Sequence, residues 1–143
     1  MSTNKLKFIS KENPSEEEIL ELRLKLRSYN DHFTEEYERT FLIEQIRNEK
    51  GMLVGGAYGI LSWDWLNIDL LWVAESLRGT GAGTKLITTI EEKAIQKGIH
   101  KFRLSTTSFQ ALDFYKKMGY SVCGEIEDLP PGHTNYFLIK TEA

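Results

Sequence analysis

A glycine-rich run, Arg78-Gly79-Thr80-Gly81-Ala82-Gly83, joins an apolar segment to a helical pattern, and it limits the possible folds more than any other feature. Glycine adopts backbone conformations that other residues resist, and it lets a ligand approach the main chain closely. The first N–H groups of a helix have no intrahelical partner, and the helix dipole adds about half a positive charge there. The run therefore predicts a turn between a strand and a helix, and the beginning of that helix is expected to bind an anion. Arg78 adds a permanent positive charge at the same place.

The spacing of the glycines narrows the ligand of this anion site. A Walker A loop ends in Gly-Lys-Ser/Thr, which the run lacks, although Lys85 follows closely. A Rossmann loop has the spacing G-x-G-x-x-G, whereas Gly79, Gly81 and Gly83 alternate and follow strands that look antiparallel. The spacing therefore disfavours both nucleotide sites and leaves the phosphate ligand open.

Before the glycine run, the sequence predicts one helix and four strands. Residues 5–9 predict a short first strand, and Ser15 with Glu18 forms a capping box that begins an amphipathic helix over residues 15–29. Three further strands, joined by short turns typical of antiparallel hairpins, are predicted over residues 40–47, 52–62 and 66–73. Strict alternation along the third would divide its side chains between Leu66, Ile68, Leu70 and Trp72 on one face and Asn67, Asp69, Leu71 and Val73 on the other.

After the run, helices and strands alternate. The sequence predicts helices over residues 81–97 and 109–118, and strands over 101–105, 120–126 and 134–140. The predicted fold class is α/β (α+β), with a mixed, mostly antiparallel twisted sheet of about seven strands flanked by helices. The length of 143 residues fits one domain over residues 1–143.

Composition excludes several classes of function. The net charge is -3 and the basic residues form no run, so we expect no nucleic-acid partner. No apolar stretch approaches the roughly 20 residues of a membrane span, and the polar start of the chain is unlike a signal peptide. The single cysteine, Cys123, is expected to be a buried strand thiol. Because one cysteine cannot form an intrachain disulfide, the composition indicates a reducing, cytoplasmic setting.

Two segments together resemble the GNAT superfamily of N-acetyltransferases. Arg78, Gly81 and Gly83 match the acetyl-CoA signature (Gln/Arg)-x-x-Gly-x-(Gly/Ala), directly after an apolar strand as in that family. The segment Phe114-Tyr115-Lys116-Lys117-Met118-Gly119-Tyr120 is similar to the later family motif Phe-Tyr-x-Lys-x-Gly-Phe. The resemblance covers nearly the entire chain and implies a GNAT-like fold.

The resemblance implies that acetyl-CoA is the cosubstrate. In this family, the strand before the loop binds the pantetheine arm through its backbone. A bulge there usually parts this strand from the next parallel one, here residues 101–105, and the thioester enters the gap. Ser108 stands where the family often has an Asn that touches the coenzyme, and Gln110 is a possible substitute. The implied coenzyme-binding residues are Trp72, Val73, Arg78, Gly79, Thr80, Gly81, Ala82, Gly83, Thr84 and Ser108.

Tyr115 falls where the family often has a general acid, which would protonate the departing thiolate of coenzyme A. The attacking amine must lose a proton, and Asp69 and Glu75 are the two carboxylates expected to act as base, directly or through water. His133, after a stiff Pro-Pro-Gly turn, is a further candidate base. No cluster of side chains has the spacing of metal ligands, so no metal is expected.

The expected reaction is acetylation of a primary amine of a small molecule or peptide, by direct transfer in a ternary complex. An aromatic-rich set in the regions where the family selects its acceptor favours a cationic amine: Tyr29, His32, Phe33, Tyr37, Trp63 and Trp65. A non-catalytic acyl-CoA-binding or regulatory module on the same fold is the alternative. A homodimer is plausible, because the strands near the C-terminus would offer an unpaired edge.

Overall fold

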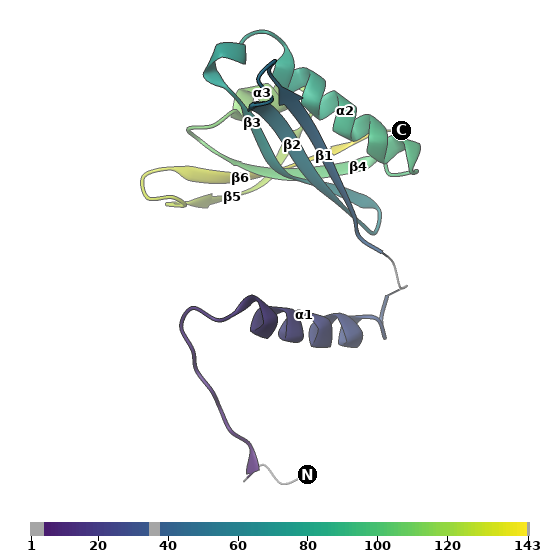
Figure 1. The fold of residues 1–143 in the computed structure, drawn as a ribbon, viewed down its shortest axis with the longest axis vertical. Coiled ribbons are helices and arrows are strands. Elements are labelled where there is room, and N and C mark those ends of the chain that lie inside the picture. Colours follow the sequence, from purple (N-terminus) through teal and green to yellow (C-terminus); the bar gives the residue numbers. More distant parts are fainter. Residues whose placement is uncertain (1–4, 35–37, 143) are drawn as a thin grey trace. The chain divides into compact units, whose positions relative to one another are not determined.

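The computed structural model describes residues 5–34 and 38–142, and the chain divides into two compact units between Glu36 and Tyr37 (Figure 1). The first unit holds helix α1 (Glu16–Asn30). Its capping box is confirmed, because the Glu18 N–H donates to the Ser15 hydroxyl over 3.1 Å and the Ser15 N–H donates to the Glu18 carboxylate over 3.0 Å. The predicted strand over residues 5–9 is wrong, because a strand needs a pairing partner and the described part of this unit contains only a helix.

The second unit is built on one mixed sheet. Its strands are β1 (Thr40–Arg47), β2 (Leu53–Ser62), β3 (Trp65–Val73), β4 (Lys101–Thr107), β5 (Ser121–Glu127) and β6 (Thr134–Thr141), in the spatial order β1-β2-β3-β4-β6-β5. Every neighbouring pair is antiparallel except β3 and β4, which run parallel. The predicted fold class is confirmed, with six strands in the described residues rather than about seven.

Two helices cover one face of the sheet, and Figure 1 shows α2 (Ala82–Gln96) lying along it. The pattern that predicted α2 also gives its buried stripe, in which Leu86, Ile87 and Ile90 are 4% exposed or less. These side chains join the core formed by alternate residues of the strands, among them Leu66, Phe102 and Leu138. The short helix α3 (Leu112–Lys117) adds Tyr115 to the same core. We call this the helix face and the other the open face.

The predicted alternation along β3 is wrong beyond Ile68, because a β-bulge interrupts it. In the register with β2, Gly59 pairs with Ile68 but Tyr58 pairs with Leu70, which leaves Asp69 as the extra residue. One extra residue moves every later side chain to the opposite face. Leu70 and Trp72 are therefore 62% and 50% exposed on the open face, whereas Leu71 and Val73 pack against the core.

Candidate active site

The bulge in β3 lies where β3 and β4 part. Their parallel pairing runs from Trp65 opposite Lys101 to Ile68 opposite Leu104 and ends there. Beyond that point β3 keeps its partner β2, and β4 keeps its partner β6. The backbone of β3 from Asp69 onward thus has no strand partner on its β4 side, and its polar groups there can pair with a ligand. We call this point the split.

Directly after β3, the chain forms the 3-10 turn η2 (Glu75–Leu77) and then the glycine run. Gly81 is the N-cap of α2 and has the left-handed conformation, with φ 86° and ψ 5°. A Cβ added to Gly79 or Gly81 would meet nothing within 4 Å, so open space surrounds this backbone. The glycines therefore serve both the left-handed turn and the approach of a ligand.

The two long helices begin in opposite electrostatic ways. The first turn of α1 has a complete capping box and three acidic residues. The first turn of α2 has no side-chain cap and no acidic residue. Among the described residues, the backbone N–H groups of Ala82, Gly83 and Thr84 have no hydrogen-bond acceptor, and the exposed Arg78 has no ion-pair partner. This beginning of α2 has the donor groups and the field that bind a phosphate.

Gly83 is the point at which three elements of the site meet. A Cβ on Gly83 would lie 3.5 Å from the Phe114 ring of α3 and 3.8 Å from a methyl group of Val73. The end of β3, the first turn of α2 and helix α3 are therefore in close contact. This packing brings the two family-like segments, which are about 30 residues apart in sequence, to one end of the sheet.

Tyr115 occupies the inner side of α3 and is 7% exposed. Its ring packs edge-on against Phe114 at 5.2 Å and against Tyr120 at 5.9 Å between centroids. The Tyr120 N–H donates to the Tyr115 carbonyl over 3.0 Å, which closes the turn after the helix. Burial raises the pKa of Tyr115 to about 12, because the phenolate would be poorly solvated. Its phenol therefore keeps its proton at neutral pH.

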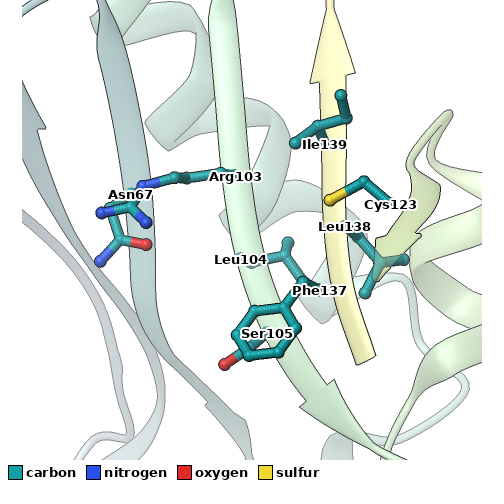
Figure 2. Close-up of a pocket in the computed structure, with 8 residues that line it drawn as sticks. All are labelled: Asn67, Arg103, Leu104, Ser105, Cys123, Phe137, Leu138 and Ile139. Atoms are coloured by element: carbon teal, nitrogen blue, oxygen red, sulfur yellow. The ribbon is translucent and has the colours of Figure 1, made fainter. Parts of the chain in front are cut away.

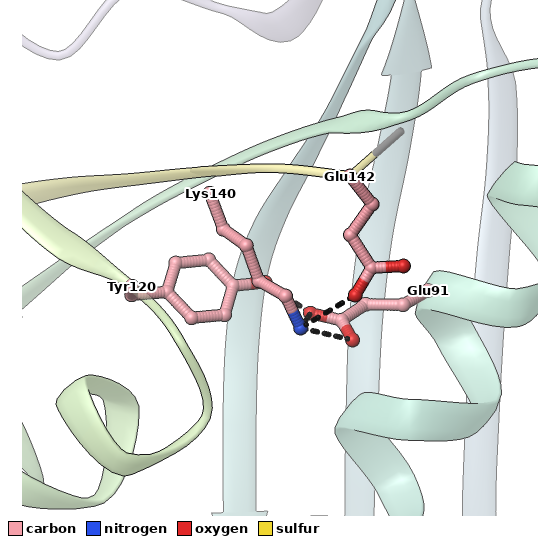
Figure 3. Close-up of polar contacts among 4 residues, drawn as sticks. All are labelled: Glu91, Tyr120, Lys140 and Glu142. Carbon is pink, nitrogen blue, oxygen red and sulfur yellow. Dashed lines mark hydrogen bonds and ion pairs between the residues drawn. The ribbon is translucent and has the colours of Figure 1, made fainter.

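A buried charged cluster, drawn in Figure 3, includes Tyr120, whose ring contacts that of Tyr115. The Glu91 carboxylate of α2 is 5% exposed and accepts hydrogen bonds from the Tyr120 hydroxyl at 2.6 Å and from Lys140 Nζ at 3.1 Å. Lys140 also pairs with Glu142 at 3.1 Å. Burial and the bond to Glu91 raise the pKa of Tyr120, so this hydroxyl stays a donor. The cluster fixes α2, β6 and the turn after α3 to one another.

The residues after β4 are held by the β5–β6 hairpin. The Ser108 hydroxyl accepts from the Thr134 N–H over 3.1 Å and lies 3.3 Å from His133 Nδ1. The Gln110 side-chain oxygen accepts from the Thr106 hydroxyl and the Thr107 N–H. Ser108 and His133 are thus adjacent, and the oxygen of Gln110 is committed to its own loop.

The two carboxylates predicted as bases occupy different places. Asp69 is the exposed bulge residue, one position past Ile68, which is the last residue of β3 that pairs with β4. Glu75 is exposed at the beginning of η2. Asp69 is therefore at the split, whereas Glu75 belongs to the turn that leads to the glycine run.

The prediction that Cys123 is a buried strand thiol is wrong, because this residue is exposed. A bulge between Val122 and Gly124 leaves it without a partner in β6, and its side chain turns away from the core. In the aromatic set, the rings of Tyr29 and Phe33 pack within the first unit at 5.3 Å, and Tyr37 lies outside the described residues.

Sequence reasoning missed several polar residues near the split. Arg103 and Asn67, directly paired across β4 and β3, line a cavity of the open face. The Thr107 hydroxyl at the end of β4 is buried and has no hydrogen-bond partner among the described residues. The alternation of buried Phe102 and Leu104 with Arg103 places Arg103 on the open face, but it does not locate the point at which β3 and β4 part.

An uncapped helix thus follows a strand that parts from its neighbour in the middle of the sheet, and such a helix end has the donor groups to bind a phosphate. A model of the acetyltransferase (GNAT) family matches residues 6–120. The chain therefore belongs to the GNAT family of acetyltransferases. Within its described residues, none of the helices has the length and apolar character that a membrane span requires, and no group of acidic, histidine or cysteine side chains could hold a metal ion.

Individual proteins that are similar to this chain are also named as acetyltransferases. The blasticidin-S acetyltransferase of Streptomyces morookaense is 42% identical over 93 residues, which are 64% of this chain and 68% of that protein. The thialysine N-epsilon-acetyltransferase of Sus scrofa is 37% identical over 62 residues, which are 41% of this chain and 36% of that protein. The crystal structure of an acetyltransferase from Bacillus cereus ATCC 14579 has a TM-score of 0.83 and 35% identity, and the match covers 94% of this chain and 98% of that one.

Proposed function

We propose that this acetyltransferase moves the acetyl group of acetyl-CoA to a primary amine of a small molecule, by direct transfer in a ternary complex. The observation that carries the proposal is the uncapped beginning of α2, which follows the part of β3 that has separated from β4. The names of two relatives support it, since one specifies the small molecule blasticidin S and the other an epsilon nitrogen.

The residues of the site fit the coenzyme in two parts. The N–H groups at the beginning of α2, from Gly81 to Thr84, would hold the pyrophosphate, with Arg78 as its cation and Gly79, Thr80 and Ala82 in the surrounding loop. The backbone of Trp72 and Val73 would bind the pantetheine arm, as a neighbouring strand would. Ser108 would contribute from the loop after β4. Bound in this way, the coenzyme supplies a thioester at the split.

The chemistry at the split needs a base, an oxyanion site and an acid. Asp69 would accept the proton of the ammonium, directly or through water, and its place at the bulge favours it over Glu75 and His133. Backbone N–H groups on the unpaired side of β3, between Asp69 and Val73, would stabilise the oxyanion as the new C–N bond forms. Tyr115 would donate its proton to the thiolate as the C–S bond breaks, which leaves free coenzyme A and the N-acetylated amine.

Isothermal titration with coenzyme A, followed by a thiol-release assay with acetyl-CoA and a panel of amines, tests this proposal. We expect micromolar binding and turnover of at least one small amine. Absence of binding at millimolar coenzyme A would overturn it. Binding without turnover of any amine, in wild type and Tyr115→Phe alike, would instead identify a non-catalytic acyl-CoA-binding module.

A further inference from the structure

A cavity of about 270 Å³ lies on the open face of the sheet, beside the split (Figure 2). It is polar on one side, where Asn67 of β3 lies beside Arg103 and Ser105 of β4, and apolar on the other, where Phe137 and Ile139 come from β6. Its volume is near the lower end of that of small-molecule sites. The cavity can therefore enclose a compact ligand or one end of a longer one.

The charge of this cavity comes from one residue. Arg103 has no ion pair or hydrogen bond to another side chain among the described residues, and none of the residues that line the cavity is a carboxylate. Its guanidinium is always protonated and presents paired N–H donors that match a carboxylate. Figure 2 shows the Arg103 side chain extending from β4 toward Asn67, whose amide can supply a further donor. The set is thus complementary to an organic anion.

The position of this set ties it to the acceptor. Asn67 and Arg103 are directly opposite each other, and the last pair before the split, Ile68 opposite Leu104, is only one residue further along. One residue of a strand spans about 3.3 Å, so the anion site lies within a few ångströms of the split along the strands. The coenzyme loop, by contrast, follows the far end of β3 after Val73.

We propose that the cavity binds a carboxylate of the acceptor, so that the enzyme acetylates amines that also bear a carboxylate, as amino acids do. This rests on the proposed function above, because the acceptor amine must reach the split. Arg103 pairs with the carboxylate, Asn67 orients it, and Phe137 and Ile139 enclose the carbon chain. The carboxylate of the acceptor would supply the partner that Arg103 lacks among the described residues.

The test compares acceptors that differ only in this charge. Acetylation rates are measured for 6-aminohexanoate against 6-aminohexanamide, and for β-alanine against β-alaninamide, with wild type and three variants. Arg103→Gln removes the charge, and Asn67→Asp places a carboxylate beside it. Lys101→Gln removes a cation two residues earlier on the same strand and is the matched control. Thermal melting of each variant shows whether it is folded.

We expect wild type to prefer one or both acids over their amides by about 10- to 100-fold in kcat/KM, as a charge-assisted hydrogen bond predicts. Arg103→Gln and Asn67→Asp should abolish that preference through a loss on the acids alone, and Lys101→Gln should keep it. Equal rates on acid and amide in wild type would overturn the proposal, as would an unchanged preference in a folded Arg103→Gln protein.

A binding measurement separates this proposal from the proposed function. NMR titration of wild type and Arg103→Gln with 6-aminohexanoate and with its amide is carried out with and without coenzyme A, and it requires no turnover. Selective binding of the acid that depends on Arg103 supports the carboxylate site even if coenzyme A fails to bind. No selective binding of the acid under either condition overturns the site, even if coenzyme A binds normally.

Discussion

The role that we propose for Tyr115 depends on where its ring is buried. A phenol in water has a pKa near 10 and a thiol a pKa near 8.5, so proton transfer from the one to a thiolate is only weakly driven. Burial raises the pKa of Tyr115 to about 12, which strengthens its hold on the proton. In the proposed reaction, a thiolate that departs beside this ring would be poorly solvated as well, so its basicity would rise and the proposed donation from Tyr115 would remain effective.

We predict that Tyr115→Phe lowers kcat by about 100-fold while the affinity for coenzyme A changes by less than about threefold. The ratio of wild-type to variant kcat should stay constant from pH 6 to pH 10, because Tyr115 is protonated well below its pKa of about 12. Steady-state kinetics over this range provides the measurement. A ratio that falls toward one as the pH approaches 10 would show that the proton in question belongs to a more acidic group.

At the scale of single elements, the beginning of α2 depends on one backbone conformation. Gly81 has φ 86°, which a side chain disfavours by about 1–2 kcal/mol, whereas Gly83 has a negative-φ backbone with room for a methyl group. Gly81 and Gly83 therefore have different structural roles. Gly81 forms the turn, whereas Gly83 lies in the first turn of α2, where an alanine would fit against Phe114 and Val73.

We predict that Gly81→Ala lowers the free energy of unfolding by about 1–2 kcal/mol and weakens coenzyme A binding about tenfold, because the N–H groups of the first turn move. Gly83→Ala is the matched control and should unfold at or above the wild-type midpoint, since alanine favours a helix. Urea unfolding and isothermal titration measure the two quantities. Equal losses of stability in both variants would contradict the assignment of the turn to Gly81.

The sequence predicted helices better than it predicted the strand at the centre of the site. Ser15 and Glu18 indicated the beginning of α1, and a regular stripe indicated α2, because both signals are local. The family resemblance implied a bulge in this strand, but its position at Asp69 could not be read from the pattern, because every residue from Leu70 to Val73 is apolar and the two faces are no longer distinguished. Arg103 was overlooked for a related reason. An arginine on the polar face of a strand is ordinary, and only the parting of two strands makes it a candidate for binding.

At the scale of the whole molecule, the cluster around Glu91 joins elements that are distant in sequence. A helix from the middle of the chain is held to its last strand through one carboxylate, with Tyr120 and Lys140 as donors. A buried ion pair adds little net stability compared with apolar packing, but the removal of one partner leaves a poorly solvated charge. The cluster therefore matters more for holding the site in one arrangement than for the total free energy of folding.

We predict that Glu91→Gln and Lys140→Met each lower the free energy of unfolding by about 3 kcal/mol, because each leaves one charge of the pair behind. The double variant should lose less than the sum by more than about 1 kcal/mol. Urea unfolding of the four proteins completes the cycle. Strict additivity would mean that Lys140 relies on Glu142, its other carboxylate partner at 3.1 Å, rather than on Glu91.

The bulge in β3 also has a consequence for how such an enzyme can evolve. Before Asp69, the strand is bound on both sides and its Leu66 and Ile68 belong to the core, so substitutions there carry the full penalty of lost packing. After Asp69, Leu70 and Trp72 stand on the open face and can be exchanged at little expense to folding. A single inserted residue thus turns the side chains of Leu70 and Trp72 out of the core, where they are free to diversify near the point at which new substrates would be tried.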